Sequence, residues 1–294
     1  GVIGQPMTLE PFQKNFGKLA DSLEDTPAGG TRAAEAIMTT DTVSKEVAVR
    51  FPLGGKMCKL GGIAKGSGMI APNMATMLCF LTTDAAISSV ALKRALTTVT
   101  ADTFNMLSVD GDTSTNDMVS ILANGMAGNT PIESCMGTDY EAFVAALYKV
   151  CEKLCAIMAK DGEGATKLLV CEVTGAKSTA AAKLVAKAVI KSTLLKAAIF
   201  GADANWGRVL CAIGYAGADV DVSKVDVNFR SNRGLIPVCR GGAGVAFSEE
   251  TAKEILMDDE ITVQVALNSG SASAKAWGCD LTYDYVKING DYRT

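Results

Sequence analysis

Histidine is absent from all 294 residues of this chain. Its absence excludes Ser-His-Asp and Cys-His catalysis, zinc sites built on imidazole, and acid–base chemistry that uses an imidazole. Any catalysis by this chain must therefore use hydroxyls, lysines, carboxylates, a free amine or backbone groups.

Long hydrophobic runs and an excess of basic charge are also missing. No apolar run approaches the ~20 residues that a membrane span needs, and no signal peptide is visible. The 28 basic and 32 acidic residues give a net charge of −4, which argues against a general nucleic-acid binder. We therefore expect neither a membrane nor a nucleic acid as partner.

Cysteine is present, but not in a pattern that indicates disulfides or a metal site. The chain has nine cysteines, an odd number, and none are spaced as CxxC. A secreted disulfide scaffold would be shorter and denser in cysteine. We expect reduced thiols that mostly fill the core, in a reducing compartment.

Hydrophobic periodicity predicts helices that alternate with strands. A hydrophobic share of 48% and a charged share of 20% are typical of a globular chain of one large or two average domains. Thr31 is expected to cap a short helix, and residues 76–83 are expected to be a strand buried on both faces. The chain is therefore predicted to be mixed α and β, with helices packed on sheets. The other predicted helices and strands are residues 12–23, 88–106, 140–159, 283–288 and one from 178, with strands in 46–63, 167–174, 225–229 and 261–265.

A glycine-rich loop precedes the strand that begins near Thr76. Lys65, Gly66 and Gly68 invite comparison with a phosphate-binding loop. The Walker pattern, however, needs Gly-Lys-Ser/Thr entering a helix, whereas a strand follows here. The loop therefore does not favour phosphate binding.

Thr76 is a candidate nucleophile at the end of this loop. A threonine hydroxyl needs a base, and without histidine the nearest base is its own α-amine, freed if the Ala75–Thr76 bond is cut. The hydroxyl can cut that bond by attacking the preceding carbonyl and passing through an ester. On spacing alone the competing interpretation is a structural threonine at a strand start.

Two other polar segments are candidates for a site. Residues 108–117 resemble a calcium loop but lack its glycine and glutamate at the sixth and twelfth positions, so they are a polar turn or a loop that supports the nucleophile. Glu163, between two glycines, can point a carboxylate into a cleft, or it is an exposed residue in a helix-ending turn.

The chain resembles the ornithine acetyltransferase family, the glutamate N-acetyltransferases of arginine biosynthesis. Residues 65–84, KGSGMIAPNMATMLCFLTTD, look like the family's processing-site signature. The resemblance spans essentially the whole chain. Further motifs in family order are residues 36–41, 110–117, 163–167, 200–208 and 285–294.

This resemblance implies an α/β fold, an αββα sandwich of the N-terminal-nucleophile type. It also implies that a precursor cleaves itself before Thr76. Residues 1–75 would then be the C-terminal part of the α chain, and residues 76–294 the β chain, which begins at the nucleophile. The two fragments would stay associated, usually as α2β2.

The implied reaction is ping-pong acetyl transfer through an acetyl-threonine. N-acetylornithine would acetylate Thr76, ornithine would leave, and glutamate would take the acetyl group. No metal or organic cofactor is implied, although some members also accept acetyl-CoA and so act as amino-acid N-acetyltransferases. Lysine, hydroxyl and amide donors suit a substrate carboxylate, and Glu163 suits its amine. The residues carried over as substrate contacts are Thr39, Lys65, Thr76, Glu163, Asn289 and Thr294.

The family pattern extends upstream of this sequence. Its oxyanion hole resembles a Thr-Gly pair, in which Gly1 would be the glycine. We therefore expect the sequence to be a fragment that lacks its N-terminal segment. The alternatives are an aminopeptidase or amidase on the same scaffold, with water as acceptor, and an inactive truncated domain. The expected compartment is the cytoplasm, or the mitochondrial matrix in a eukaryote.

Overall fold

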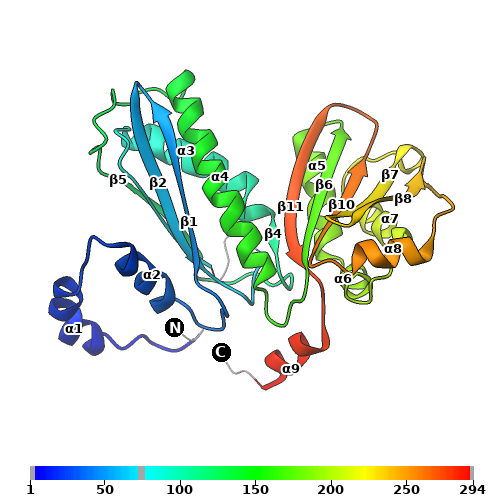
Figure 1. Cartoon of the computed structure of the whole chain (residues 1–294), viewed down its shortest axis with the longest axis horizontal. Coiled ribbons are helices and arrows are strands. Elements are labelled where there is room, and N and C mark those ends of the chain that lie inside the picture. Colours follow the sequence, from blue (N-terminus) through cyan, green and yellow to red (C-terminus); the bar gives the residue numbers. More distant parts are fainter. Residues whose placement is uncertain (1–3, 72–76, 292–294) are drawn as a thin grey trace.

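The computed structural model describes residues 4–71 and 77–291, which build two β-sheets and the helices around them (Figure 1). In this part of the chain one sheet has four strands in the order β1-β2-β3-β5, and the other has seven in the order β4-β11-β6-β10-β7-β8-β9. The first sheet contains β1 (Lys45–Leu53), β2 (Lys56–Lys65), β3 (Leu78–Thr83) and β5 (Met118–Ala123). The second contains β4 (Leu107–Ser108), β6 (Leu168–Ala176), β7 (Asp226–Ser231), β8 (Gly234–Arg240), β9 (Ala243–Gly244), β10 (Glu260–Ala266) and β11 (Ala272–Cys279).

The hairpin predicted in residues 46–63 is confirmed as β1 and β2. Its turn uses Gly54 and Gly55, whose φ angles of +52° and +74° lie in the left-handed region that glycine adopts without strain. β3 then pairs antiparallel with β2, and Lys65 lies opposite Leu78. This register brings the end of β2 beside the start of β3.

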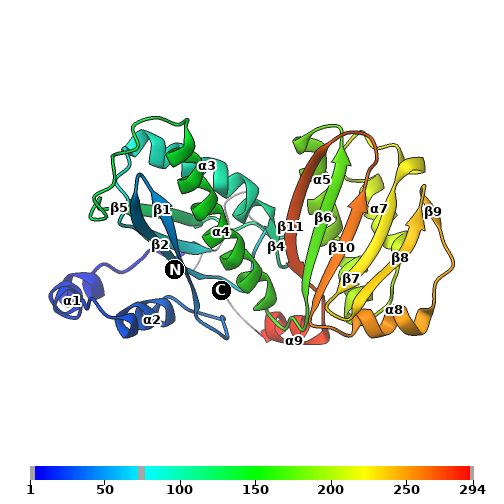
Figure 2. The same cartoon turned by 45° about the horizontal axis from the view of Figure 1, so that its top comes forward.

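Helices form two layers, as Figure 2 shows. α4 (Thr138–Lys160) packs between the sheets, against β1 and β2 on one side and β6 and β11 on the other, with α3 (Ser89–Asp102) beside it. α5 (Thr179–Lys191) covers the other face of the seven-stranded sheet. The remaining helical segments are α1 (Glu10–Asp21), α2 (Pro27–Ala36), η1 (Phe104–Met106), α6 (Thr193–Phe200), α7 (Trp206–Gly214), η2 (Val222–Lys224), α8 (Glu249–Leu256) and α9 (Tyr283–Asp291).

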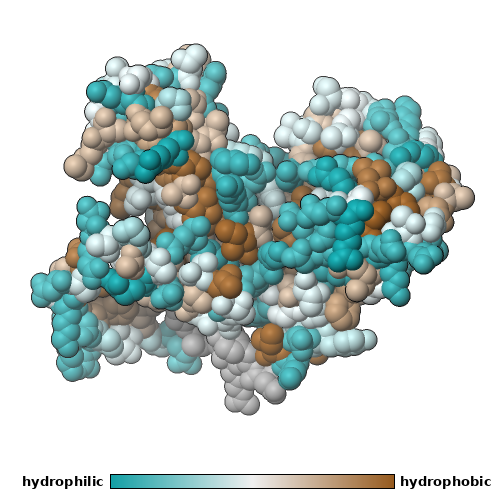
Figure 3. Space-filling view, viewed as in Figure 1, coloured by the Kyte–Doolittle hydropathy of each residue, from teal (hydrophilic) through white to brown (hydrophobic). Residues whose placement is uncertain are grey.

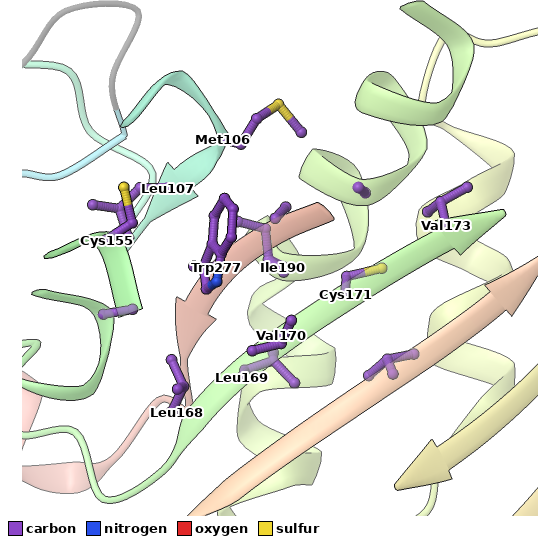
Figure 4. Close-up of a cluster of buried hydrophobic side chains, with 14 of the residues drawn as sticks. Met106, Leu107, Cys155, Leu168, Leu169, Val170, Cys171, Val173, Ile190 and Trp277 are labelled. Carbon is purple, nitrogen blue, oxygen red and sulfur yellow. The ribbon is translucent and has the colours of Figure 1, made fainter. Parts of the chain in front are cut away.

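The core is continuous across these layers. Trp277 of β11, only 2% exposed, points toward Leu107 of β4 and Cys155 of α4, while Ile190 of α5 lies on the opposite side of the strand (Figure 4). Seven of the nine cysteines are buried and all nine are free thiols. The expectation that cysteine mostly fills the core is therefore confirmed.

The N-terminal helices lie at the edge of the molecule (Figure 1). No residue of α1 is buried, and Phe12, Phe16 and Leu19 are exposed. α2 lies by the four-stranded sheet, and the recess between them, lined by Ile63 and Phe80 among others, is visible at the left of Figure 3. Because the interface between α2 and the four-stranded sheet is short, the apolar face of the sheet that lines the recess remains partly open.

Two sequence predictions about these elements are wrong. Thr26, not Thr31, caps the short helix, because its hydroxyl accepts the N–H of Gly29 at 3.0 Å and the helix begins at Pro27. β3 is buried on one face only, since Cys79 and Leu81 face the core while Phe80 faces the recess. The mixed α/β sandwich itself is confirmed. No helix in residues 4–71 and 77–291 is long and apolar enough to cross a membrane.

Candidate active site

Lys65 and Thr39 form the first half of the candidate site. Lys65 is the last residue of β2 and only 7% exposed, and its Nζ donates to Thr39 Oγ1 at 2.9 Å. Asp41 holds the backbone at both residues of this pair. Its carboxylate accepts the N–H of Thr39 at 3.2 Å and the N–H of Gly66, which follows Lys65, at 2.6 Å. The ammonium group is thereby fixed beside a hydroxyl at the start of the glycine-rich loop.

A buried ion cluster supports that arrangement. Lys45 Nζ, fully buried, lies 2.7 Å from Asp41 Oδ1 and 2.5 Å from Asp161 Oδ2. Asp161 also accepts hydrogen bonds from the N–H and the hydroxyl of Thr42. Burial alone would raise the pKa of Asp41, but the hydrogen bonds from Lys45, Gly66 and Thr39 and the charge of Lys45 together hold that pKa below its ordinary value. The cluster ties the residues before β1 to the end of α4.

Glu163 forms the second half of the site. It follows the C-terminal end of α4, and its N–H donates to the carbonyl of Ser67 at 2.8 Å. Its carboxylate lies against Gly68, where a Cβ would stand 2.3 Å from the carboxyl carbon. The side chain is half-buried, so the interpretation of Glu163 as an exposed turn residue is wrong. The glycine is what leaves space for the carboxylate.

The loop between β2 and the predicted cleavage site is held by Asp110. This carboxylate accepts the N–H groups of Met69, at 2.6 Å, and Ile70, at 2.9 Å. Met69 has a φ of +53°, a conformation that costs a non-glycine residue free energy unless its surroundings enforce it. Thr113 Oγ1 also donates to the carbonyl of Ala71 at 3.0 Å. Residues 108–117 therefore support the glycine-rich loop, the second of the two interpretations of that segment.

α9 closes the site from the C-terminal side. Asn289 Nδ2 donates to Glu163 Oε2 at 2.9 Å, and the hydroxyl of Tyr285 lies 3.4 Å from Asp110. Burial, together with Asp110, Asp112 and Glu163, raises the pKa of Tyr285 to about 12. The helix can approach this closely because Gly164 faces it without a side chain. The predicted contact Asn289 thus belongs to a helix that packs against the site.

The two halves meet through Ser67. Its hydroxyl lies 2.7 Å from Thr40 Oγ1, next to Thr39, and its carbonyl accepts the N–H of Glu163. The structure thus brings together four of the predicted substrate contacts. They are Thr39, Lys65, Glu163 and Asn289.

The remaining predicted site residues lie outside the described residues. They are Gly1, Ala75, Thr76 and Thr294. Sequence reasoning missed Lys45, Asp41 and Asp161 as supports of the site. Among the described residues, no group of three or more Cys, Asp or Glu side chains is arranged to hold a metal ion.

The fold and these contacts define a mixed α/β sandwich protein with a glycine-lined polar site between the ends of its two sheets. The model of the ArgJ family matches residues 1–294. The chain belongs to the ArgJ family.

Named relatives agree with this assignment. The chain is 52% identical to "Arginine biosynthesis bifunctional protein ArgJ 1" of Clostridium acetobutylicum and 46% identical to "Arginine biosynthesis bifunctional protein ArgJ" of Bacillus subtilis. Each match covers all of this chain, and 71% and 70% of the two relatives. The crystal structure of the argJ protein of Bacillus halodurans matches with a TM-score of 0.69 and 47% identity, over 72% of this chain and 98% of that chain.

Proposed function

We propose that this chain is a self-processing acetyltransferase of arginine biosynthesis. It moves an acetyl group from N-acetylornithine to glutamate through an acetyl-enzyme on Thr76. The ArgJ match over the whole chain carries this proposal. The pairs Lys65–Thr39 and Glu163–Asn289 support it, because they supply the charges that two amino-acid substrates require.

Cleavage of the Ala75–Thr76 bond would produce the active form. The hydroxyl of Thr76 attacks the carbonyl of Ala75, the peptide C–N bond breaks, and the freed α-amine takes the hydroxyl proton. Water then hydrolyses the ester, which restores the hydroxyl of Thr76 and leaves a carboxylate on Ala75. Residues 1–75 and 76–294 are then two chains that remain associated. Residues 76–294 are about three quarters of the sequence.

Acetyl transfer would then use the freed amine. The α-amine of Thr76 takes the proton of the hydroxyl, and Oγ attacks the acetyl carbonyl of N-acetylornithine. The tetrahedral intermediate collapses, its C–N bond breaks, and ornithine leaves with the proton. The amine of glutamate next attacks the acetyl-threonine ester and regenerates the hydroxyl. Gly1 would contribute to the oxyanion hole in both steps.

Lys65 and Glu163 would bind opposite ends of the substrate. Lys65, with Thr39 beside it, would bind the α-carboxylate, since its charge lies where little water competes. Glu163 would bind the ammonium group of ornithine, and Asn289 would orient it. Thr294 is the remaining proposed contact.

Several properties of the proposed enzyme follow from its family rather than from these contacts. We propose that it uses no metal or organic cofactor and accepts acetyl-CoA as a second acetyl donor. The associated fragments would form an α2β2 assembly in the cytoplasm.

A labelled-acetyl assay tests this function. The protein is incubated with N-acetylornithine labelled in the acetyl group, with and without glutamate. Labelled N-acetylglutamate, formed with little free acetate, is the expected result. Free acetate formed at the same rate without glutamate would instead indicate a hydrolase.

A further inference from the structure

Asp117 has no role in the proposed mechanism, but it contacts the residue next to the proposed nucleophile. It immediately precedes β5, and its Oδ1 accepts the N–H of Met77 at 2.7 Å. The next residue, Met118, donates its own N–H to the carbonyl of Met77 at 3.0 Å. Asp117 and the first residue of β5 therefore hold both backbone polar groups of Met77, the residue that follows Thr76.

The other oxygen of Asp117 is buried in the wall of a pocket that reaches the surface, where Thr97 and Met118 are exposed. The cavity measures about 220 Å³ and lies between α3, η1 and the starts of β3 and β5. Within residues 4–71 and 77–291, three buried oxygens in it have no hydrogen-bond partner: Asp117 Oδ2, Thr100 Oγ1 and Asn105 Oδ1. Unpartnered buried oxygens are rare in native proteins. The pocket has room for water, which would satisfy these three oxygens.

Asp117 is partly buried, and its surroundings favour the neutral carboxyl group. Burial raises the pKa of Asp117 to about 6, against the lowering effects of the Met77 N–H and the charge of Lys65. The other residues that line the pocket carry no ionisable side chain. Among the described residues, Lys65 is thus the charged group whose field lowers the pKa of Asp117, although it does not line the pocket.

We propose that Asp117 is a positioning residue for the nucleophile, which holds the backbone of Met77 while pocket water satisfies its second oxygen. This inference rests on the proposed function, in which Thr76 reacts. Since Thr76 is bonded directly to Met77, a shift of Met77 moves the reacting group, and misplacement by about 1 Å can cost about 100-fold in rate.

Two variants separate positioning from mere folding. Asp117→Ala removes the acceptor, so kcat and the rate of self-cleavage should each fall about 10- to 100-fold, while KM for both substrates stays within about twofold. Asp117→Asn keeps an oxygen for Met77 and turns its amide toward the unpartnered oxygens of Thr100 and Asn105. It should rescue kcat to within about threefold of wild type.

Thr100→Val is the matched control, because it alters the same pocket without touching Met77; it should leave kcat unchanged. Amide hydrogen exchange at Met77 adds a readout independent of activity, with protection lost in Asp117→Ala and retained in Asp117→Asn. The inference is overturned if Asp117→Ala keeps wild-type kcat and Met77 protection, or if Thr100→Val is equally impaired. Wild-type protein that neither cleaves nor transfers acetyl would refute the proposed function itself, whatever Met77 exchange shows.

Discussion

Asn289 Nδ2 lies 2.9 Å from Oε2 of Glu163, although 126 positions separate the two residues in the sequence. Glu163 follows the helix between the two sheets, and Asn289 belongs to the last helix of the chain. The contact joins the C-terminal segment to the glycine-rich loop, because the carboxylate also lies against Gly68. The helix α9 is therefore part of the candidate site.

Glu163→Gln should weaken binding of the substrate amine. The amide keeps the size of the side chain but loses the charge, and a hydrogen bond to a charged group contributes about 1.5–3 kcal/mol. We expect KM for N-acetylornithine or ornithine to rise about 10- to 100-fold in steady-state assays. Asp284→Asn, which removes an exposed carboxylate of the same C-terminal helix, is the control and should change KM less than twofold.

Gly68→Ala should damage the site without unfolding the protein. Its Cβ would stand 2.3 Å from the Glu163 carboxyl carbon, and that flexible side chain would have to move away. We expect kcat/KM to fall about 10-fold or more while the melting temperature changes little. Gly17→Ala, where nothing lies within 4 Å, is the matched substitution. Wild-type kcat/KM in Gly68→Ala would show that the position of Glu163 is unimportant.

Lys65→Met should affect the other end of the substrate. The variant retains the buried aliphatic stem but loses the ammonium group that donates to Thr39. KM for glutamate, measured in the second half-reaction, should rise about 10-fold or more. Lys56→Met, at the opposite and exposed end of the same strand, should have no effect on KM. Equal KM values for both variants would exclude Lys65 from carboxylate binding.

Lys45→Met should destabilise the fold in a pH-dependent way. It leaves Asp41 and Asp161 without their cation, and breaking a buried ion pair costs about 3–5 kcal/mol. Because the folded protein lowers the pKa of Asp41, this group stabilises the wild type above the unfolded pKa of about 3.9, and that contribution is lost on acidification through the lower folded pKa.

The difference between wild type and Lys45→Met in urea denaturation should therefore be larger at pH 7 than at pH 3. Lys14→Met breaks an exposed pair with Glu10 and should cost less than about 1 kcal/mol. A loss as small for Lys45→Met would mean that the buried cluster does not contribute to stability.

Local patterns predicted much of the fold. The hairpin, the helix over residues 138–160 and the C-terminal helix have strong periodicity or turn signals, and the structure confirms each. The prediction for β3 failed because a run of apolar residues does not show that one face of the strand remains half-open. The cap of α2 was predicted at Thr31, but Pro27 suits the first turn of a helix, so the helix begins there and Thr26 caps it.

The candidate site was predictable only where its residues lie in recognisable motifs. Lys65 and Glu163 stand beside glycines in segments that resemble family motifs. The residues that support them lie in no such motif. Lys45, for example, begins a strand and contacts Asp161, which is 116 positions away in the sequence. The hydrogen bond that Met77 N–H donates to Asp117 joins residues 40 positions apart, and it likewise depends on how β3 and β5 pair.

The most direct test of the account is the intact mass of the denatured protein, measured beside Thr76→Ala. The account predicts two wild-type species that divide the sequence between Ala75 and Thr76, and one uncut species for the variant. The wild-type protein should also gain about 42 Da on the fragment that begins at Thr76 when N-acetylornithine is added without glutamate, the mass of one acetyl group. A single uncut wild-type chain, or a cut that persists in Thr76→Ala, would contradict the assignment of Thr76 as nucleophile.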